Sequence, residues 1–140
     1  MKKIFLASRY IFLAMIFIGL SSCEKDKLTL LTGGVWKFSN LTTTSVDEVA
    51  TAFIAGYKAI HTDATLEFFE DGSFEKDAPL FEEPETGEYE LFGENQIVFT
   101  IGDAVYTVSL DKVTKDELIY IETYIDGQGS PYPAKFKWTR

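Results

Sequence analysis

The sequence contains one cysteine and one histidine among its 140 residues. These counts exclude a disulfide within one chain and a metal site built from several His and Cys side chains. It also lacks a glycine-rich phosphate loop and a serine-centred nucleophile motif. Lys and Arg total 13 against 22 Asp and Glu, and the net charge of −9 argues against a surface that binds nucleic acid or anionic lipid. We therefore expect no cofactor, no metal and no catalytic residues, and we do not predict an enzyme.

The few polar groups that could suggest chemistry have simpler structural interpretations. His61 and Asp63 are two residues apart near an expected helix end, where a cap and a solvated turn account for them. The segment Asp126-Gly127-Gln128-Gly129 lacks the spaced acidic ligands of a calcium loop, so we interpret it as a hairpin turn. Four glutamates alternate with apolar residues, and the apolar residues are expected to point into the interior. The glutamates are therefore predicted to face water: Glu67, Glu88, Glu90 and Glu122.

The N-terminus has the charge order of a signal peptide. Lys2 and Lys3 precede an apolar stretch that runs from Ile4 to Leu20. A membrane-spanning anchor is the alternative, because such a helix needs roughly 20 apolar residues. Arg9, which lies inside the stretch, argues against that alternative.

The segment Leu20-Ser21-Ser22-Cys23, directly after this stretch, resembles the lipobox of Gram-negative lipoproteins. The resemblance implies a diacylglycerol linked to Cys23 through a thioether, cleavage before Cys23 and acylation of the freed amine. We therefore predict a signal peptide over residues 1–22, a lipidated tether over 23–29 and one domain over 30–140. The lipid on Cys23 is expected to anchor the protein to the membrane of the cell envelope, most simply the outer membrane, with the periplasmic face and the cell surface both open.

From Val35 onward the apolar residues recur with a period of two, in short runs separated by turn residues such as Asp71-Gly72 and Gly102-Asp103. This pattern is typical of an antiparallel all-β domain, and short connections favour a meander of sequential neighbours. A meander of eight strands removes its edges by closing into a barrel. The expected strands are approximately Val35–Asn40, Thr65–Glu70, Ser73–Lys76, Gly87–Leu91, Gln96–Ile101, Ala104–Asp111, Leu118–Ile125 and Tyr132–Thr139.

One helix of roughly four turns is predicted between Val46 and His61, inserted between the first and second strands. Ser45 and Glu48 have the spacing of a capping box at its start. The apolar residues that recur at intervals of three and four form one stripe, which must be buried: Val49, Ala52, Phe53, Gly56, Tyr57 and Ile60.

The first strand opens with Gly34-Val35-Trp36, and the segment from Leu66 to Phe74 contains an Asp-Gly turn between aromatic residues. Both features resemble lipocalins and the lipocalin-like domains of bacterial lipoproteins. The resemblance implies an eight-stranded antiparallel lipocalin-like barrel in which Gly34 admits the chain, Trp36 plugs the closed end and an arginine covers the indole. Arg140 shares a strand face with Trp138, so it is the candidate cover.

A barrel of eight strands is wide enough either to be filled by its own side chains or to hold one small ligand. Two functions therefore stay open: binding of a small hydrophobic ligand, and a non-catalytic protein-interaction or inhibitor module with a partner that the sequence does not name. In the first case the inserted helix would act as a lid over the mouth, with Phe53 and Tyr57 facing the cavity. Tyr89 and Tyr106 would then offer hydroxyls to the ligand. The helix has a competing role, which is simple packing on the outer wall.

Overall fold

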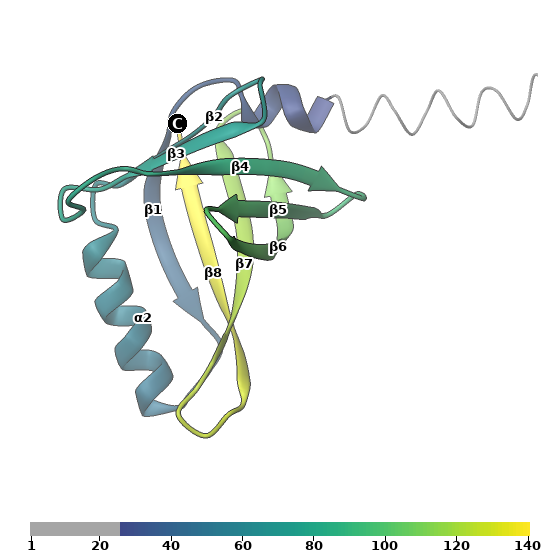
Figure 1. Cartoon of the computed structure of the whole chain (residues 1–140). Coiled ribbons are helices and arrows are strands. Elements are labelled where there is room, and N and C mark those ends of the chain that lie inside the picture. The colour runs from purple at the N-terminus through teal and green to yellow at the C-terminus, as the bar shows by residue number, and fades with distance from the viewer. Residues whose placement is uncertain (1–25) are drawn as a thin grey trace, which may run out of the picture.

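A computed structural model describes residues 26–140; the predicted signal peptide (1–22) and Cys23 lie outside the described residues. The chain forms one closed barrel of eight antiparallel strands in which every strand pairs with its sequence neighbours and the last returns to the first (Figure 1). The predicted all-β meander barrel with one inserted helix is thus confirmed. The strands are β1 (Trp36–Thr43), β2 (Thr65–Phe68), β3 (Ser73–Asp77), β4 (Glu85–Phe92), β5 (Gln96–Ile101), β6 (Ala104–Val113), β7 (Glu117–Ile125) and β8 (Pro131–Thr139).

The predicted strand boundaries differ most at β1, which continues three residues beyond the expected end at Asn40. Its register against β8 shifts between Phe38 and Asn40, the mark of a β-bulge. A bulge adds one residue and breaks the alternation of apolar and polar positions. The pattern in the sequence therefore ends at the bulge, although the strand does not.

The helix α2 (Glu48–Ile60) lies between β1 and β2 in sequence, as predicted, but its cap and its buried face differ from the prediction. Asp47, not Ser45, is the N-cap, and its carboxylate accepts a hydrogen bond from the Ala50 backbone N–H at 2.9 Å. Its buried residues are Ala50 and Ile54, whereas most of the expected stripe is exposed. Tyr57, which is half-buried, is the exception.

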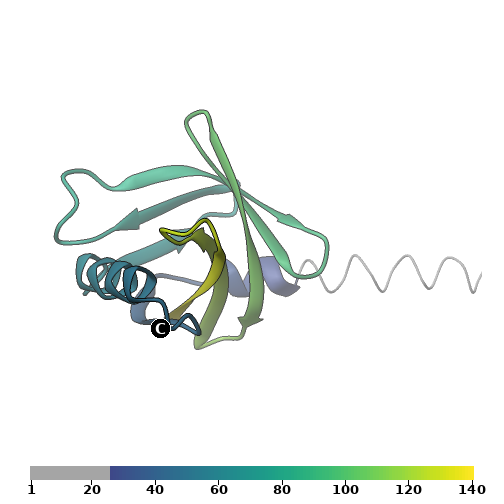
Figure 2. The ribbon, with the colours of Figure 1, turned by 90° about the horizontal axis from the view of Figure 1, so that it is seen from below.

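The inner face of α2 packs against the wall of the barrel at β1. Pairing between β1 and β2 is limited to Trp36 with Leu66 and Lys37 with Thr65, and α2 runs beside the wall that this short pairing leaves (Figures 1 and 2). The Tyr57 ring lies 5.8 Å from that of Phe136, an interior residue of β8. The helix thus contacts the interior of the barrel through Tyr57.

The end of the barrel opposite the mouth is closed by Trp36, which is fully buried. The guanidinium carbon of Arg140 lies 3.6 Å from the centroid of the indole, so the contact expected between these two residues is present. Arg140 Nη2 also donates hydrogen bonds to the carbonyls of Leu30 at 2.6 Å and Leu31 at 3.0 Å. These carbonyls end a helical turn over residues 26–31, most of which was predicted to belong to the tether. The turn is thereby fastened to the closed end.

Much of the barrel interior is filled by side chains. Aromatic rings account for much of it, with Phe74 and Phe99 in edge contact at 4.9 Å and Tyr120 stacked on Phe136 at 5.1 Å. Its most completely buried members are Trp36, Leu66, Phe68, Ile97, Val108, Leu118, Phe136 and Trp138. A filled core is therefore the correct description of this part of the barrel, and space for a ligand has to lie beside it.

Candidate functional site

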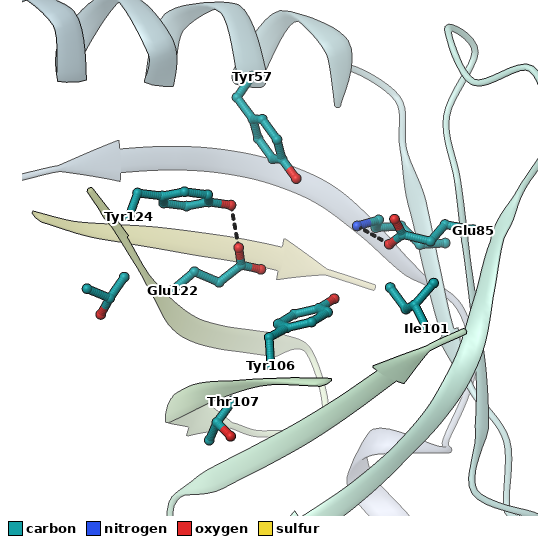
Figure 3. Close-up of a pocket in the computed structure, with 9 residues that line it drawn as sticks. Tyr57, Glu85, Ile101, Tyr106, Thr107, Glu122 and Tyr124 are labelled. Atoms are coloured by element: carbon teal, nitrogen blue, oxygen red, sulfur yellow. Dashed lines mark hydrogen bonds and ion pairs between the residues drawn. The ribbon is translucent and has the colours of Figure 1, made fainter. Parts of the chain in front are cut away.

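A partly open pocket of about 310 Å³, called the chamber below, lies where β6 and β7 separate. The two strands pair from Ser109 with Ile121 to Val113 with Leu118, and beyond Ser109 and Ile121 towards the mouth they are not paired with each other. Tyr57 reaches into the same space from α2 (Figure 3). The residues that line it are Tyr57, Lys76, Glu85, Ile101, Tyr106, Thr107, Glu122, Thr123 and Tyr124.

Glu122 faces the interior, so the expectation that it lies on the outer face is wrong. Leu118, Tyr120, Glu122 and Tyr124 occupy alternate positions of β7, and the first two are buried in the core. The hydroxyl of Tyr124 donates a hydrogen bond to Glu122 Oε2. Burial raises the pKa of the Glu122 carboxyl above its ordinary value of 4.5, although the hydrogen bond from Tyr124 offsets part of the rise.

Lys76 and Glu85 form an ion pair on the other side of the chamber. They are directly opposite each other in the register of β3 and β4, and Lys76 Nζ lies 2.5 Å from Glu85 Oε1. The Lys76 side chain is buried, and it shares the inward face of β3 with Phe74. This pair was not predicted, although the two-residue spacing from Phe74 to Lys76 in the sequence places the lysine on the apolar face of its strand.

Three tyrosines complete the lining: Tyr57, Tyr106 and Tyr124 (Figure 3). Burial raises the pKa of each phenol above its ordinary value of 10.0, with nearby Glu122 adding to the effect at all three. Their hydroxyls therefore keep their protons at neutral pH. They can donate hydrogen bonds to a guest, and their rings offer flat apolar surface to it.

The structure brings together two of the four residues predicted to line a ligand cavity, Tyr57 and Tyr106. Phe53 does not line this chamber. It is 42% exposed, and its ring stacks on Tyr57 at 5.6 Å from outside. Tyr89 borders a different pocket of about 360 Å³. Its side chain is buried, its hydroxyl donates to the Phe69 carbonyl at 2.9 Å, and burial raises its pKa to about 12.

The residues predicted to close the barrel lie together at the other end. Gly34 has a φ of 140°, in the region that favours glycine, and it leads the chain into Trp36. Gly33 was not predicted to matter, yet a Cβ there would come within 2.8 Å of Arg140 Nη1. The absence of a side chain at Gly33 thus gives Arg140 room over the indole.

His61 is the C-cap of α2, as expected, but it is buried and not in a solvated turn. Its Nδ1 lies 2.9 Å from the Tyr57 carbonyl, and its ring is surrounded by Phe38, Tyr57, Phe81 and Phe136. Burial lowers the pKa of the imidazole below 6.5. It does not line the chamber.

The chamber offers hydrogen bonds, one ion pair, a buried carboxyl and aromatic faces. Within residues 26–140, no three His, Cys, Asp or Glu side chains are grouped so that they could hold a metal ion. In that same part of the chain no helix has both the length and the apolar character needed to cross a membrane. The arrangement is suited to holding and orienting a small molecule.

No protein-family model matches this sequence, and a search of curated proteins also found no match. The geometry of the chamber is therefore the main guide to function.

Proposed function

We propose that this protein is a lipid-anchored, lipocalin-like binding protein of the cell envelope that holds one small ligand in the chamber beneath α2. The observation that carries the proposal is the convergence of the Lys76–Glu85 pair, Glu122 and three tyrosines on one space of about 310 Å³. Ligand sites are typically concave, with a few polar groups placed among apolar and aromatic ones. A volume at the small end of the usual range of about 300–1,000 Å³ suits a compact guest.

The lining also bears on the kind of ligand. A purely apolar guest would separate the buried polar groups of Glu122, Lys76 and the tyrosines from water without replacing its hydrogen bonds, which is unfavourable. We therefore narrow the expected hydrophobic ligand to an amphiphilic one, with polar atoms for these groups and apolar atoms for the rings. No proton-transfer or nucleophilic step is part of the proposal.

Membrane anchoring through Cys23 rests on the sequence Leu20-Ser21-Ser22-Cys23. Two or more acyl chains are sufficient for stable attachment to a bilayer. The test compares the protein with its Cys23→Ala variant by detergent partitioning and by the mass of the N-terminal peptide. A mature N-terminus upstream of Cys23, or an unmodified cysteine, would exclude the lipid anchor.

Ligand binding can be tested by filling the chamber. Ile101 lines it, so Ile101→Trp should occupy its space, whereas Val105→Trp on exposed β6 is a matched control that adds the same bulk outside. Saturation-transfer NMR with compact amphiphiles of cationic, neutral and anionic charge should give signals that Ile101→Trp removes and Val105→Trp keeps. If no compound gives a signal that depends on position 101, the binding function is wrong.

A second candidate is a protein-interaction module, favoured by apolar side chains that are exposed around the start of α2. Val46 is 95% exposed, Val49 59% and Phe53 42%. Exposed apolar surface of this kind often marks a contact site for another protein. Val46→Asp with Val49→Asp, which keeps Phe53 on the Tyr57 ring, should leave ligand signals intact under the binding proposal. Loss of a cross-linked envelope partner in the same variant would favour the interaction module.

A further inference from the structure

The charges of the chamber do not cancel. Lys76 and Glu85 neutralise each other at 2.5 Å, while Glu122, which accepts a hydrogen bond from Tyr124, has no ion-pair partner among the described residues. An ionised Glu122 therefore leaves the chamber with one net negative charge. A buried carboxylate without a counterion is costly, and a cation that enters beside it removes that cost.

The aromatic groups complement the same charge. Tyr57, Tyr106 and Tyr124 come from three different elements, α2, β6 and β7, and border the chamber that Glu122 also lines (Figure 3). The face of an aromatic ring carries partial negative charge and attracts ammonium groups, most strongly where water is excluded. Rings around a carboxylate are the combination by which proteins recognise organic cations.

We propose that the chamber binds a small organic cation, with an alkylated ammonium group beside Glu122 and its methyl groups against the rings of Tyr57, Tyr106 and Tyr124. This inference rests on the proposed binding function and names its ligand class. An anion is disfavoured because the one cationic side chain in the lining, Lys76, is already bound to Glu85. A long hydrocarbon is disfavoured because the chamber measures only about 310 Å³ and the core beyond it is filled.

The proposal predicts a dependence on pH. The groups that face Glu122 are Tyr57 from α2, Lys76 from β3, Glu85 from β4, Tyr106 from β6 and Tyr124 from β7. The tyrosines stay neutral at neutral pH, and burial raises the pKa of Glu122, so Glu122 takes up a proton at a higher pH than an ordinary carboxyl does. Binding of a permanent cation should weaken as the pH falls and Glu122 takes up a proton.

The test uses three probes of nearly the same shape and different charge. Choline carries a permanent trimethylammonium cation, 3,3-dimethyl-1-butanol replaces its nitrogen with carbon and is neutral, and 3,3-dimethylbutanoate is an anion. Isothermal titration calorimetry on the full chain in a maltoside detergent, without choline lipids, should show choline binding at least about tenfold more tightly than the neutral alcohol.

Two variants and one control assign the effect to residues. Glu122→Gln should lower the affinity for choline by about tenfold, which removes the preference for choline, and should leave the affinity for the neutral alcohol unchanged. Tyr106→Leu removes an aromatic ring and should also weaken the binding of choline. Because the two variants test the proposal independently, the test stays valid if one of them does not fold. Glu75→Gln on the exposed face of β3 removes the same charge outside the chamber and should change nothing.

The outcomes separate this inference from the proposed function. Equal affinity for choline and the neutral alcohol, or tighter binding of the anion, would overturn the cation assignment and leave a binding barrel. Absence of binding by all three probes also overturns it. Only the further absence of any signal that depends on position 101 would overturn the binding function as well.

Discussion

Gly87 of β4 lies so close to Thr100 of β5 that a Cβ on Gly87 would come within 2.2 Å of the Thr100 carbonyl oxygen. The ring of Phe74, its partner on β3, would be 2.9 Å from the same Cβ. An aromatic ring placed over a strand glycine covers the backbone that the glycine leaves bare. Gly87 thus lets β4 approach its neighbours closely, two residues from Glu85 in the chamber.

We expect Gly87→Ala to lower the free energy of unfolding by about 3 kcal/mol or more, because backbone atoms and a packed ring cannot both move aside. Gly56→Ala is the control, since no atom lies within 4 Å of a Cβ on this exposed helical glycine. That substitution should stabilise the protein by about 0.5–1 kcal/mol. Urea unfolding followed by circular dichroism measures both, and similar effects at the two positions would contradict the close approach at Gly87.

Arg140→Ala should destabilise the barrel by about 1–2 kcal/mol, because it removes the contact with the Trp36 ring and the hydrogen bonds to Leu30 and Leu31. Lys137→Ala breaks only a surface ion pair with Glu117 and should cost less than about 0.5 kcal/mol. Chemical unfolding of both variants distinguishes them. Equal effects would mean that the cover over the indole adds little.

His61 is the only histidine, so NMR can follow its imidazole without assignment against others. The folded protein should titrate below 6.5, because burial disfavours the charged ring. Between the two pKa values the unfolded chain binds more protons than the folded one, so this group should reduce stability as the pH falls below 6.5. A folded-state titration at or above 6.5 would show that the ring is solvated.

Glu122 should have the opposite effect on stability. Its pKa is raised in the folded state, so the folded protein binds more protons than the unfolded chain, and stability falls as the pH rises above 4.5 until Glu122 is ionised in both states. Glu122→Gln should flatten this part of the profile and stabilise the protein at pH 8 relative to the parent. Urea unfolding from pH 4 to pH 8 measures the difference; parallel profiles for the two proteins would contradict the buried carboxyl.

Much of the fold could be predicted because strand alternation and turn residues are local signals. The helix was located correctly by its apolar spacing, yet its buried face was not, since Val49 and Phe53 are apolar and still exposed. The spacing of Ala50, Ile54, Tyr57 and His61 marks the same helix one position further on. Only the geometry of the barrel decides which of two adjacent stripes faces inward.

The chamber was harder to predict. Tyr57 and Tyr106 were found as aromatic residues, but Lys76, Glu85 and Glu122 were interpreted as solvated or left out, because charged residues are seldom buried unless they are paired. The partner of Lys76 is nine residues away and on another strand, and register alone brings the two together. The alternation of apolar and polar residues within one strand does not predict which residues pair across neighbouring strands.

The helical turn over residues 26–31 is hydrogen-bonded to Arg140 at the end of the barrel opposite the mouth, so residue 26 lies at that end (Figure 1). A lipid on Cys23 would be joined to residue 26 by a chain that spans at most about 10 Å. The nine residues of β8 run from the mouth to the closed end, a strand about 30 Å long. Under the proposed anchoring, the chamber would exchange its ligand with the surrounding water. The bilayer would hold the protein in place and would not deliver the ligand.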